Sequence, residues 1–209
     1  MNPATDYLLI VEDDPDILKL LDATLTFKGY RVLTAHNGKE GLEAIRMKRP
    51  AIVIADIMMP KLDGFGLVHR MRINPQTRDI PVVFITATYI AREDRDFALS
   101  IGATRFMQKP IDLDKFLAMI AELLEQRLPA AAKPFNELDF YNEYCRRLEA
   151  KLEEKIKQIA RDVHLLGTDA DKEDPFLEAS LRQTIHERDE LQLLLDQVHQ
   201  QLEKYAKSE

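Results

Sequence analysis

Three acidic side chains, a threonine and a lysine stand at the ends of apolar segments in the first 110 residues of the chain. Glu12 and Asp13 come directly after one such segment, and Asp56, Thr86 and Lys109 stand at the ends of three others. Carboxylates grouped without cysteine or histidine suit a hard, oxygen-seeking cation such as Mg²⁺. Beside such a cation, Asp56 can act as a nucleophile that accepts a phosphoryl group as an acyl phosphate. Lys109 then offers a positive charge, and Thr86 a hydroxyl donor, to the phosphoryl oxygens.

An alternation of strand and helix patterns over residues 1–127 predicts how these side chains meet. The apolar, mostly β-branched segment 51–56 is typical of a buried strand in a parallel sheet. Further strands are predicted at Tyr7–Val11, Arg31–Ala35, Val82–Thr86 and Arg105–Gln108, with helices from Pro15, at Gly38–Met47, Gly64–Arg72 and Ala91–Ile101, and from Asp112 to about Arg127. These five βα units predict a doubly wound, flavodoxin-like α/β fold with a five-stranded parallel sheet in the order 2-1-3-4-5. In that order strands 1, 3, 4 and 5 are neighbours, so their carboxyl ends converge on one cavity.

Two further aspartates have predicted roles in local structure. Asp14 stands immediately before Pro15, a favourable first residue of a helix, and is predicted to start that helix rather than to bind a ligand. Asp63 stands before Gly64 and is predicted to be a turn residue.

The composition narrows the class of protein. The chain has 209 residues, of which 45% are hydrophobic, and this is sufficient for a globular core. It holds no run of 18 apolar residues and lacks the basic-then-apolar pattern of a signal peptide, so we expect neither secretion nor a membrane span. Cys145 is the single cysteine, which excludes an intrachain disulfide and any cysteine-based metal cluster and favours a cytoplasmic protein.

The charge is distributed unevenly along the chain. Residues 1–134 hold 18 basic and 18 acidic residues, whereas residues 135–209 hold 11 and 18. We expect a first domain at 1–128, a linker with two prolines at 129–134 and a helical region at 135–209. Because that last region is acidic and lacks helix-turn-helix proportions, we expect no nucleic-acid partner.

Two apolar stripes run through the helical region. The first comprises Leu138, Tyr141, Cys145, Leu148, Leu152, Ile156, Ile159, Val163 and Leu166, and the second comprises Leu177, Leu181, Thr184, Arg188, Leu191, Leu195, Val198, Leu202 and Tyr205. Steps of three and four, with a polar loop at 167–175, predict an antiparallel helical hairpin or coiled coil. Ile185 and Leu194 widen the second stripe beyond what one helix covers, so we expect two hairpins to pair in a homodimer. The alternative is a monomer whose hairpin folds back on its own first domain.

Four short motifs occur in a fixed order along the first 110 residues. They are Leu9-Ile10-Val11-Glu12-Asp13-Asp14, Asp56-Ile57-Met58-Met59-Pro60, Thr86-Ala87 and Lys109-Pro110. With these motifs, the chain over residues 7–127 resembles a response-regulator receiver domain, as used in bacterial and archaeal two-component signalling.

The resemblance implies a phosphorylation site and a metal site. Asp56 would be the phosphoacceptor that takes its phosphoryl group from a cognate sensor histidine kinase. Mg²⁺ would be the cofactor, bound by Asp56 and directly by Asp13. Glu12 would act on the ion through water, and the backbone carbonyl of Met58 would be the third protein ligand.

The resemblance also implies a conformational switch. Thr86 and Phe106 would form the switch pair, with phenylalanine in place of tyrosine at the aromatic position, and Lys109 would contact the phosphoryl group. A receiver of this kind is not an enzyme for an external substrate, since it catalyses only its own phosphorylation and dephosphorylation.

Two hypotheses cover the whole chain. In the first, phosphorylation of Asp56 switches the receiver surface, and the helical extension serves dimerisation or signal output through a downstream protein. In the second, the chain is the front part of a longer hybrid sensor kinase or a phosphorelay protein, whose helices form a phosphotransfer or dimerisation element. His164, His186 and His199 lie on those helices, where a phosphotransfer histidine is conceivable. The 209 residues contain no nucleotide-binding glycine pattern, so this chain alone is not an ATP-dependent kinase.

Overall fold

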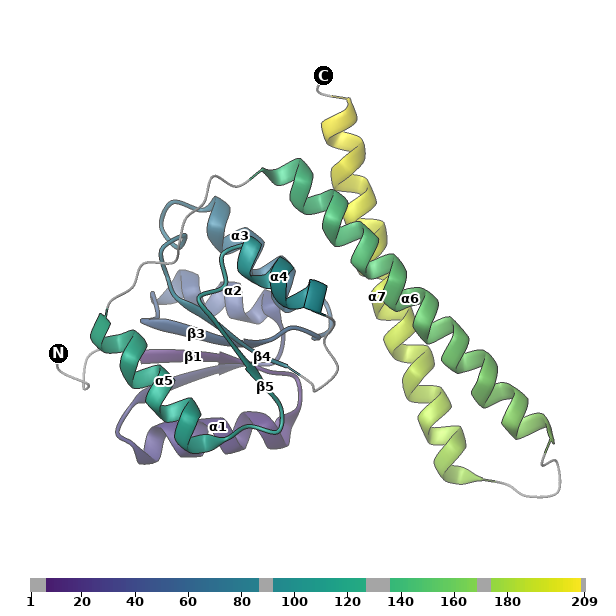
Figure 1. Ribbon diagram of the computed structural model, residues 1–209, viewed down its shortest axis with the longest axis horizontal. Coiled ribbons are helices and arrows are strands. Elements are labelled where there is room, and N and C mark those ends of the chain that lie inside the picture. The colour runs from purple at the N-terminus through teal and green to yellow at the C-terminus, as the bar shows by residue number, and fades with distance from the viewer. Residues whose placement is uncertain (1–6, 87–91, 127–135, 169–173, 208–209) are drawn as a thin grey trace. The chain divides into compact units, whose positions relative to one another are not determined.

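The computed structural model describes residues 7–86, 92–126, 136–168 and 174–207. The chain divides into two units, residues 1–135 and 136–209, each with its own packing (Figure 1). The predicted linker 129–134 lies outside the described residues, so the predicted domain bounds stay a prediction.

A five-stranded parallel sheet in the order β2-β1-β3-β4-β5 forms the centre of the first unit. Its strands are β1 (Tyr7–Val11), β2 (Arg31–Ala35), β3 (Ile52–Asp56), β4 (Val82–Thr86) and β5 (Arg105–Gln108). Every residue of β1, β3 and β4 is buried, as expected for strands covered on both faces. The doubly wound fold and its strand order are therefore confirmed.

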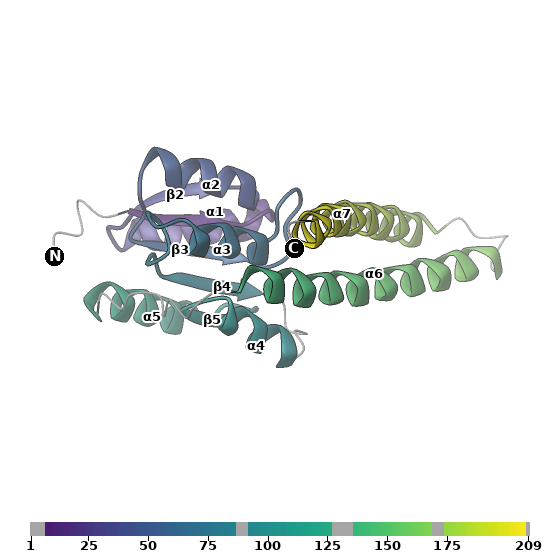
Figure 2. The same cartoon turned by 90° about the horizontal axis from the view of Figure 1, so that it is seen from above.

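Five helices cover the two faces of this sheet. They are α1 (Pro15–Phe27), α2 (Gly38–Met47), α3 (Gly64–Ile73), α4 (Arg92–Ser100) and α5 (Leu113–Gln126). Helices α1 and α5 lie on one face, and α2, α3 and α4 lie on the other (Figures 1 and 2). Aliphatic and phenylalanine side chains of α1 and α5 pack with those of β1, β3 and β4 on the first face. On the second face, Phe65 of α3 makes edge-to-face contacts with Phe84 and Phe97, at centroid distances of 5.7 and 5.0 Å.

The two aspartates with predicted local roles both cap helices. Asp14 Oδ1 accepts hydrogen bonds from the backbone N–H groups of Asp16 (2.8 Å) and Ile17 (3.1 Å), which confirms that it starts α1. Asp63 Oδ1 accepts from the N–H of Gly66 at 2.8 Å and caps α3. The prediction of a turn residue at Asp63 was wrong, because the helix begins at the very next residue and its first N–H groups need an acceptor.

Helices α6 (Glu137–Thr168) and α7 (Pro175–Ala206) pack along each other and form the second unit. This arrangement confirms the predicted helical hairpin. The buried residues of the two helices are Phe140, Tyr144, Cys145, Leu148, Thr184, Leu191, Leu194, Leu195 and Val198. Helix α6 continues through Gly167 and Thr168, which the sequence had assigned to the connecting loop.

Three members of the first predicted stripe are exposed. Leu138, Ile156 and Val163 are 39%, 50% and 52% exposed, whereas Phe140 and Tyr144 are buried. Successive residues of a helix are about 100° apart, so Leu138, Ile156 and Val163 lie on the same edge of the stripe. The buried strip is turned towards the opposite edge, where Phe140 and Tyr144 lie.

Candidate functional site

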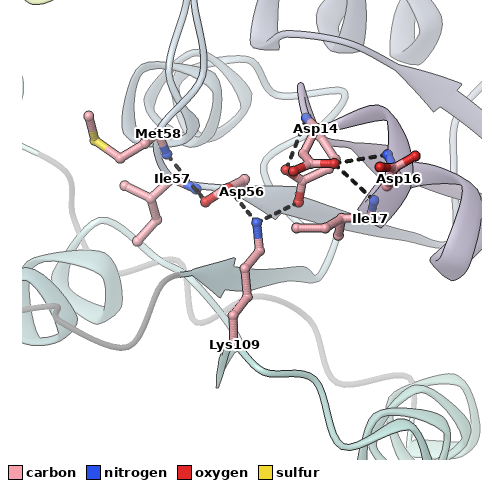
Figure 3. A network of polar contacts seen from close by, with 8 residues as sticks. Asp14, Asp16, Ile17, Asp56, Ile57, Met58 and Lys109 are labelled. Atoms are coloured by element: carbon pink, nitrogen blue, oxygen red, sulfur yellow. Dashed lines mark hydrogen bonds and ion pairs between the residues drawn. The ribbon is translucent and has the colours of Figure 1, made fainter. Parts of the chain in front are cut away.

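Asp56 lies at the carboxyl end of β3 with only 9% of its surface exposed. Its Oδ1 atom accepts hydrogen bonds from the backbone N–H groups of Ile57 at 2.6 Å and Met58 at 3.4 Å. Its Oδ2 atom lies 2.7 Å from Nζ of Lys109 (Figure 3). The carboxylate is thus fixed by the backbone on one oxygen and faces a cation with the other.

Glu12 and Asp13 extend from the end of β1 into the same site. Glu12 is 1% exposed, and its Oε2 lies 2.9 Å from Nζ of Lys109 while its Oε1 accepts the N–H of Asp14 at 3.3 Å. Glu12, Asp13 and Asp56 each have a carboxylate oxygen within 4.8 Å of the others. The structure therefore brings together the three acids that the sequence predicted as a cluster.

The electrostatics of this carboxylate cluster are unfavourable even beside Lys109. Burial, and then the charge of Asp56, raises the pKa of Glu12 to about 7, against the opposing effect of Lys109. Burial also raises the pKa of Asp13, with a further contribution from Asp56. Three clustered carboxylates and no nitrogen or sulfur donor fit a hard divalent ion such as Mg²⁺.

Lys109 follows β5 and joins Glu12 to Asp56. Its backbone N–H donates to the carbonyl of Thr86 at 2.6 Å, which fixes the start of its side chain beside β4. Burial lowers the pKa of Lys109, but its hydrogen bonds to Asp56 and Glu12 and their charges outweigh burial and raise it. The ammonium group therefore stays charged and offsets part of the carboxylate repulsion.

The two predicted switch residues lie on neighbouring strands. Thr86 ends β4 with 1% exposure and is paired with Gln108 of β5, while Phe106 is half-buried and paired with Phe84. Since Phe106 precedes Gln108 by two residues, Thr86 and Phe106 point to the same face of the sheet. Ala87, the second residue of the Thr86-Ala87 motif, lies outside the described residues.

Met58 and Gly64 shape the loop that follows β3. Met58 is 39% exposed beside Asp56, and its predicted role as a carbonyl ligand stays a prediction. Gly64 donates its N–H to the carbonyl of Ile57 at 2.8 Å, and a Cβ atom added to Gly64 would lie 2.3 Å from the carbonyl oxygen of Asp56. Sequence reasoning missed this glycine as a part of the site, although its position after Asp63 in the loop was the available signal.

The comparisons with known proteins agree with this geometry. The family model of the response regulator receiver domain matches residues 8–121. The DNA-binding dual master transcriptional regulator RpaA of Synechocystis sp. is 36% identical over 128 residues, which cover 60% of this chain and 53% of that protein. The transcriptional regulatory protein GlrR of Escherichia coli is 36% identical over 132 residues, which cover 63% of this chain and 29% of that protein.

Two solved structures resemble the first unit. The chemotaxis protein CheY4 of Vibrio cholerae has a TM-score of 0.55 at 29% identity, covering 58% of this chain and all of that one. The signal receiver domain of a signal transduction histidine kinase from Syntrophus aciditrophicus has a TM-score of 0.55 at 28% identity, covering 64% of this chain and 96% of that one.

The matched region has clear limits. Helices α6 and α7 follow the last residue that the family model matches. The chain spans about half the length of the curated relatives it matches first, between 50% and 53%. Over the matched half, the motifs, the sheet order and the clustered acids all agree, and the chain belongs to the response regulator receiver domain family.

Proposed function

We propose that this chain is a two-component response regulator that accepts a phosphoryl group on Asp56 from a cognate sensor histidine kinase. The observation that carries the proposal is the convergence of Glu12, Asp13 and Lys109 on one buried aspartate at a strand end. Its only catalysis is its own phosphorylation and dephosphorylation.

The chain's own residues support an in-line transfer. Oδ2 of Asp56 forms a bond to phosphorus while the bond from phosphorus to the imidazole nitrogen of the phosphohistidine breaks, and that nitrogen keeps the electron pair. Oδ1 stays held by the N–H of Ile57. Lys109, which contacts Oδ2 beforehand at 2.7 Å, moves to the phosphoryl oxygens, and Thr86 offers them its hydroxyl.

Mg²⁺ is the proposed cofactor of this transfer. Asp13 and Asp56 would bind it directly, together with the carbonyl of Met58, and Glu12 would act through water. When bound, the ion supplies positive charge that neutralises the phosphoryl oxygens.

Intact-mass measurement after incubation with a small acyl phosphate and Mg²⁺ tests the proposal. We expect one added phosphoryl group in the wild type and none in Asp56→Asn or in the presence of a chelator. Asp14→Asn is the matched control, because it removes a neighbouring carboxylate while asparagine still caps α1. Equal labelling of Asp56→Asn and wild type would show that Asp56 is not the acceptor.

For the helical extension we propose dimerisation or signal output without contact to DNA. RpaA is named as DNA-binding, but its match covers only 60% of this chain, and residues 135–209 hold 18 acidic against 11 basic side chains. An acidic surface repels DNA, whatever the DNA sequence. Fluorescence anisotropy with labelled duplex DNA tests this, and saturable binding by the full chain at moderate salt would contradict it.

A second candidate is the receiver of a longer phosphorelay protein or hybrid kinase. It is favoured by the likeness to the receiver domain of a histidine kinase from Syntrophus aciditrophicus. Transfer of the phosphoryl group from Asp56 to a histidine of α6 or α7 would support it. The two products differ in stability, because a phosphohistidine survives base and is hydrolysed in acid, whereas an aspartyl phosphate is hydrolysed in base.

Among the described residues, no helix is long and apolar enough to cross a membrane. As a separate point, we propose that the protein acts in the cytoplasm.

A further inference from the structure

Three side chains with metal-binding atoms meet on the helical hairpin, outside the phosphorylation site. Sγ of Cys145 on α6 lies 3.1 Å from Nε2 of His199 on α7 and 3.6 Å from Oε1 of Glu149. Nε2 of His199 lies 3.9 Å from Oε1 of Glu149. The contact between Cys145 and His199 joins positions 54 residues apart in the chain.

The helices determine how these atoms meet. Cys145 and Glu149 are four residues apart, so they lie on the same face of α6. Cys145 is buried in the strip between the helices, whereas the side chains of His199 and Glu149 are 48% and 55% exposed. The cluster therefore lies at the edge of the strip, where an ion from solvent can reach it and keep an open coordination position.

The donor set and spacing identify the class of ion. Zinc bonds of about 2.3 Å to sulfur and about 2.0–2.2 Å to nitrogen or oxygen place tetrahedral ligands about 3.3–3.6 Å apart. Of the three observed separations, 3.6 Å lies within that range, whereas 3.1 and 3.9 Å lie just below and just above it, so small side-chain shifts bring all three donors to one ion. A thiolate with an imidazole and a carboxylate selects a borderline-soft transition metal and disfavours Mg²⁺.

We propose that Cys145, Glu149 and His199 form a Zn²⁺-type site that links α6 to α7. Binding displaces the thiol proton of Cys145 to solvent, and the sulfur and the imidazole nitrogen each donate an electron pair to the ion. The fourth position is filled by water. Because the ion joins both helices, its binding stabilises the hairpin by mass action.

Another histidine on α7 provides a matched control. His186 Nε2 lies 3.8 Å from Oε1 of Glu190, four residues later on the same helix, and its side chain is 73% exposed. This pair repeats the imidazole and the carboxylate without a thiol from α6. If the site needs all three donors, replacing His199 should abolish metal binding, and replacing His186 should not affect it.

Titration of the full chain with Co²⁺, followed by Zn²⁺, tests the proposal. Co²⁺ bound to a thiolate absorbs in the near ultraviolet, and since the chain has one cysteine, that band reports on Cys145 alone. We expect saturation at one equivalent, displacement by Zn²⁺ and no displacement by excess Mg²⁺. Cys145→Ser should lose the band.

The ligand variants separate this site from chance binding. We expect His199→Gln and the exposed Glu149→Gln to bind Co²⁺ at least about tenfold more weakly, since even outer-shell partners are worth about 10–100-fold. His186→Gln should bind as wild type does, and circular dichroism should show full helix content in all variants. The proposal is overturned if wild type gives no thiolate band, or if His186→Gln weakens Co²⁺ binding as much as His199→Gln.

Discussion

The sheet unit and the helical hairpin differ in how deeply they bury their charged side chains. In the sheet unit, Glu12 and Asp56 are 1% and 9% exposed, and both depend on Lys109 for compensation. In the hairpin, the ion pair between Lys155 and Glu187 leaves the two side chains 28% and 38% exposed. A sheet covered on both faces buries the side chains of its last strand residues, whereas each of two paired helices covers only one strip of the other.

This difference predicts where a substitution matters. Charges in the sheet unit interact at low effective dielectric, so removal of one partner leaves another uncompensated. The charges of Lys155 and Glu187 are partly screened by water, so their ion pair contributes little. The chemistry of the receiver is therefore sensitive to backbone placement, and the hairpin is sensitive mainly to what covers its remaining apolar surface.

The largest expected effect is steric and compares a glycine in each unit. A Cβ atom on Gly64 would lie 2.3 Å from the carbonyl oxygen of Asp56 and 2.8 Å from Cε1 of Phe84, whereas Gly167 of α6 has nothing within 4 Å. Gly64→Ala should lower the free energy of unfolding by about 3 kcal/mol or more. Gly167→Ala should be neutral or raise it by about 0.5 kcal/mol.

Chemical denaturation followed by circular dichroism measures both glycine variants. Equal stability of Gly64→Ala and wild type would mean that the loop after β3 adapts freely, and it would remove the contrast between the two units.

The next effect is a pH dependence that arises from Glu12. Its pKa is about 7 in the folded protein against 4.5 unfolded, so between these values the folded state keeps a proton that the unfolded state releases. The free energy of unfolding of the metal-free protein should therefore fall, by about 3 kcal/mol, as the pH rises through this window. Asp13, whose pKa is also raised, acts in the same direction.

Denaturation in chelator at a series of pH values measures this slope. Glu12→Gln should flatten it, because glutamine does not titrate. Asp14→Asn should leave it unchanged, since the N–H groups of Ile17 and Asp16 lower the pKa of Asp14 and place its titration below the window. A slope that persists in Glu12→Gln would assign the effect to another group.

A smaller effect is expected from Mg²⁺ at neutral pH. An ion among Glu12, Asp13 and Asp56 relieves their repulsion, and at about a hundred times its Kd it should stabilise the fold by about 2.7 kcal/mol. Asp13→Ala should abolish this gain and raise the stability of the metal-free protein. Glu43→Ala, at an exposed position of α2, is the control. An equal shift of the melting temperature by Mg²⁺ in wild type and Asp13→Ala would place the metal elsewhere.

The sequence was sufficient for the sheet unit because its constraints are local or topological. Period and turn residues predicted β1 to β5, and the parallel order by itself brought Glu12, Asp56 and Lys109 to one edge. The steric role of Gly64 could not be predicted, because it depends on a backbone contact between β3 and the start of α3.

The pairing of α6 with α7 depends on their rotation and register, and a stripe of apolar residues determines neither. Heptad spacing gives only the approximate face of each helix. The sequence therefore placed Ile156 in the buried strip, where the structure has it half-exposed. It also considered His199 only as a conceivable phosphotransfer histidine, because its proximity to Cys145 exists only in one register.

The smallest effects per residue concern the apolar surface that the hairpin leaves exposed. Ile156 and Val163, seven residues apart on one face of α6, are 50% and 52% exposed. We predict that they support a homodimer through the hairpin, since pairing two hairpins covers what one partner helix cannot. Light scattering should then give a dimer mass for the full chain and a monomer mass for residues 1–134, and a monomer for both at micromolar concentration would exclude the dimer.

The double variant Ile156→Gln with Val163→Gln separates dimerisation from folding of the hairpin. Burial of the exposed half of each side chain contributes about 1 kcal/mol to association. The two substitutions together should therefore weaken the dimer by roughly tenfold or more. Helix content should stay at the wild-type value, because the strip between α6 and α7 consists of other residues, among them Leu148 and Leu195. Met47→Gln removes an 88% exposed apolar side chain from the sheet unit and should leave the dimer intact. If Met47→Gln dissociates the dimer while the α6 variant does not, the interface lies on the sheet unit, and the hairpin then leaves its apolar face for a different partner.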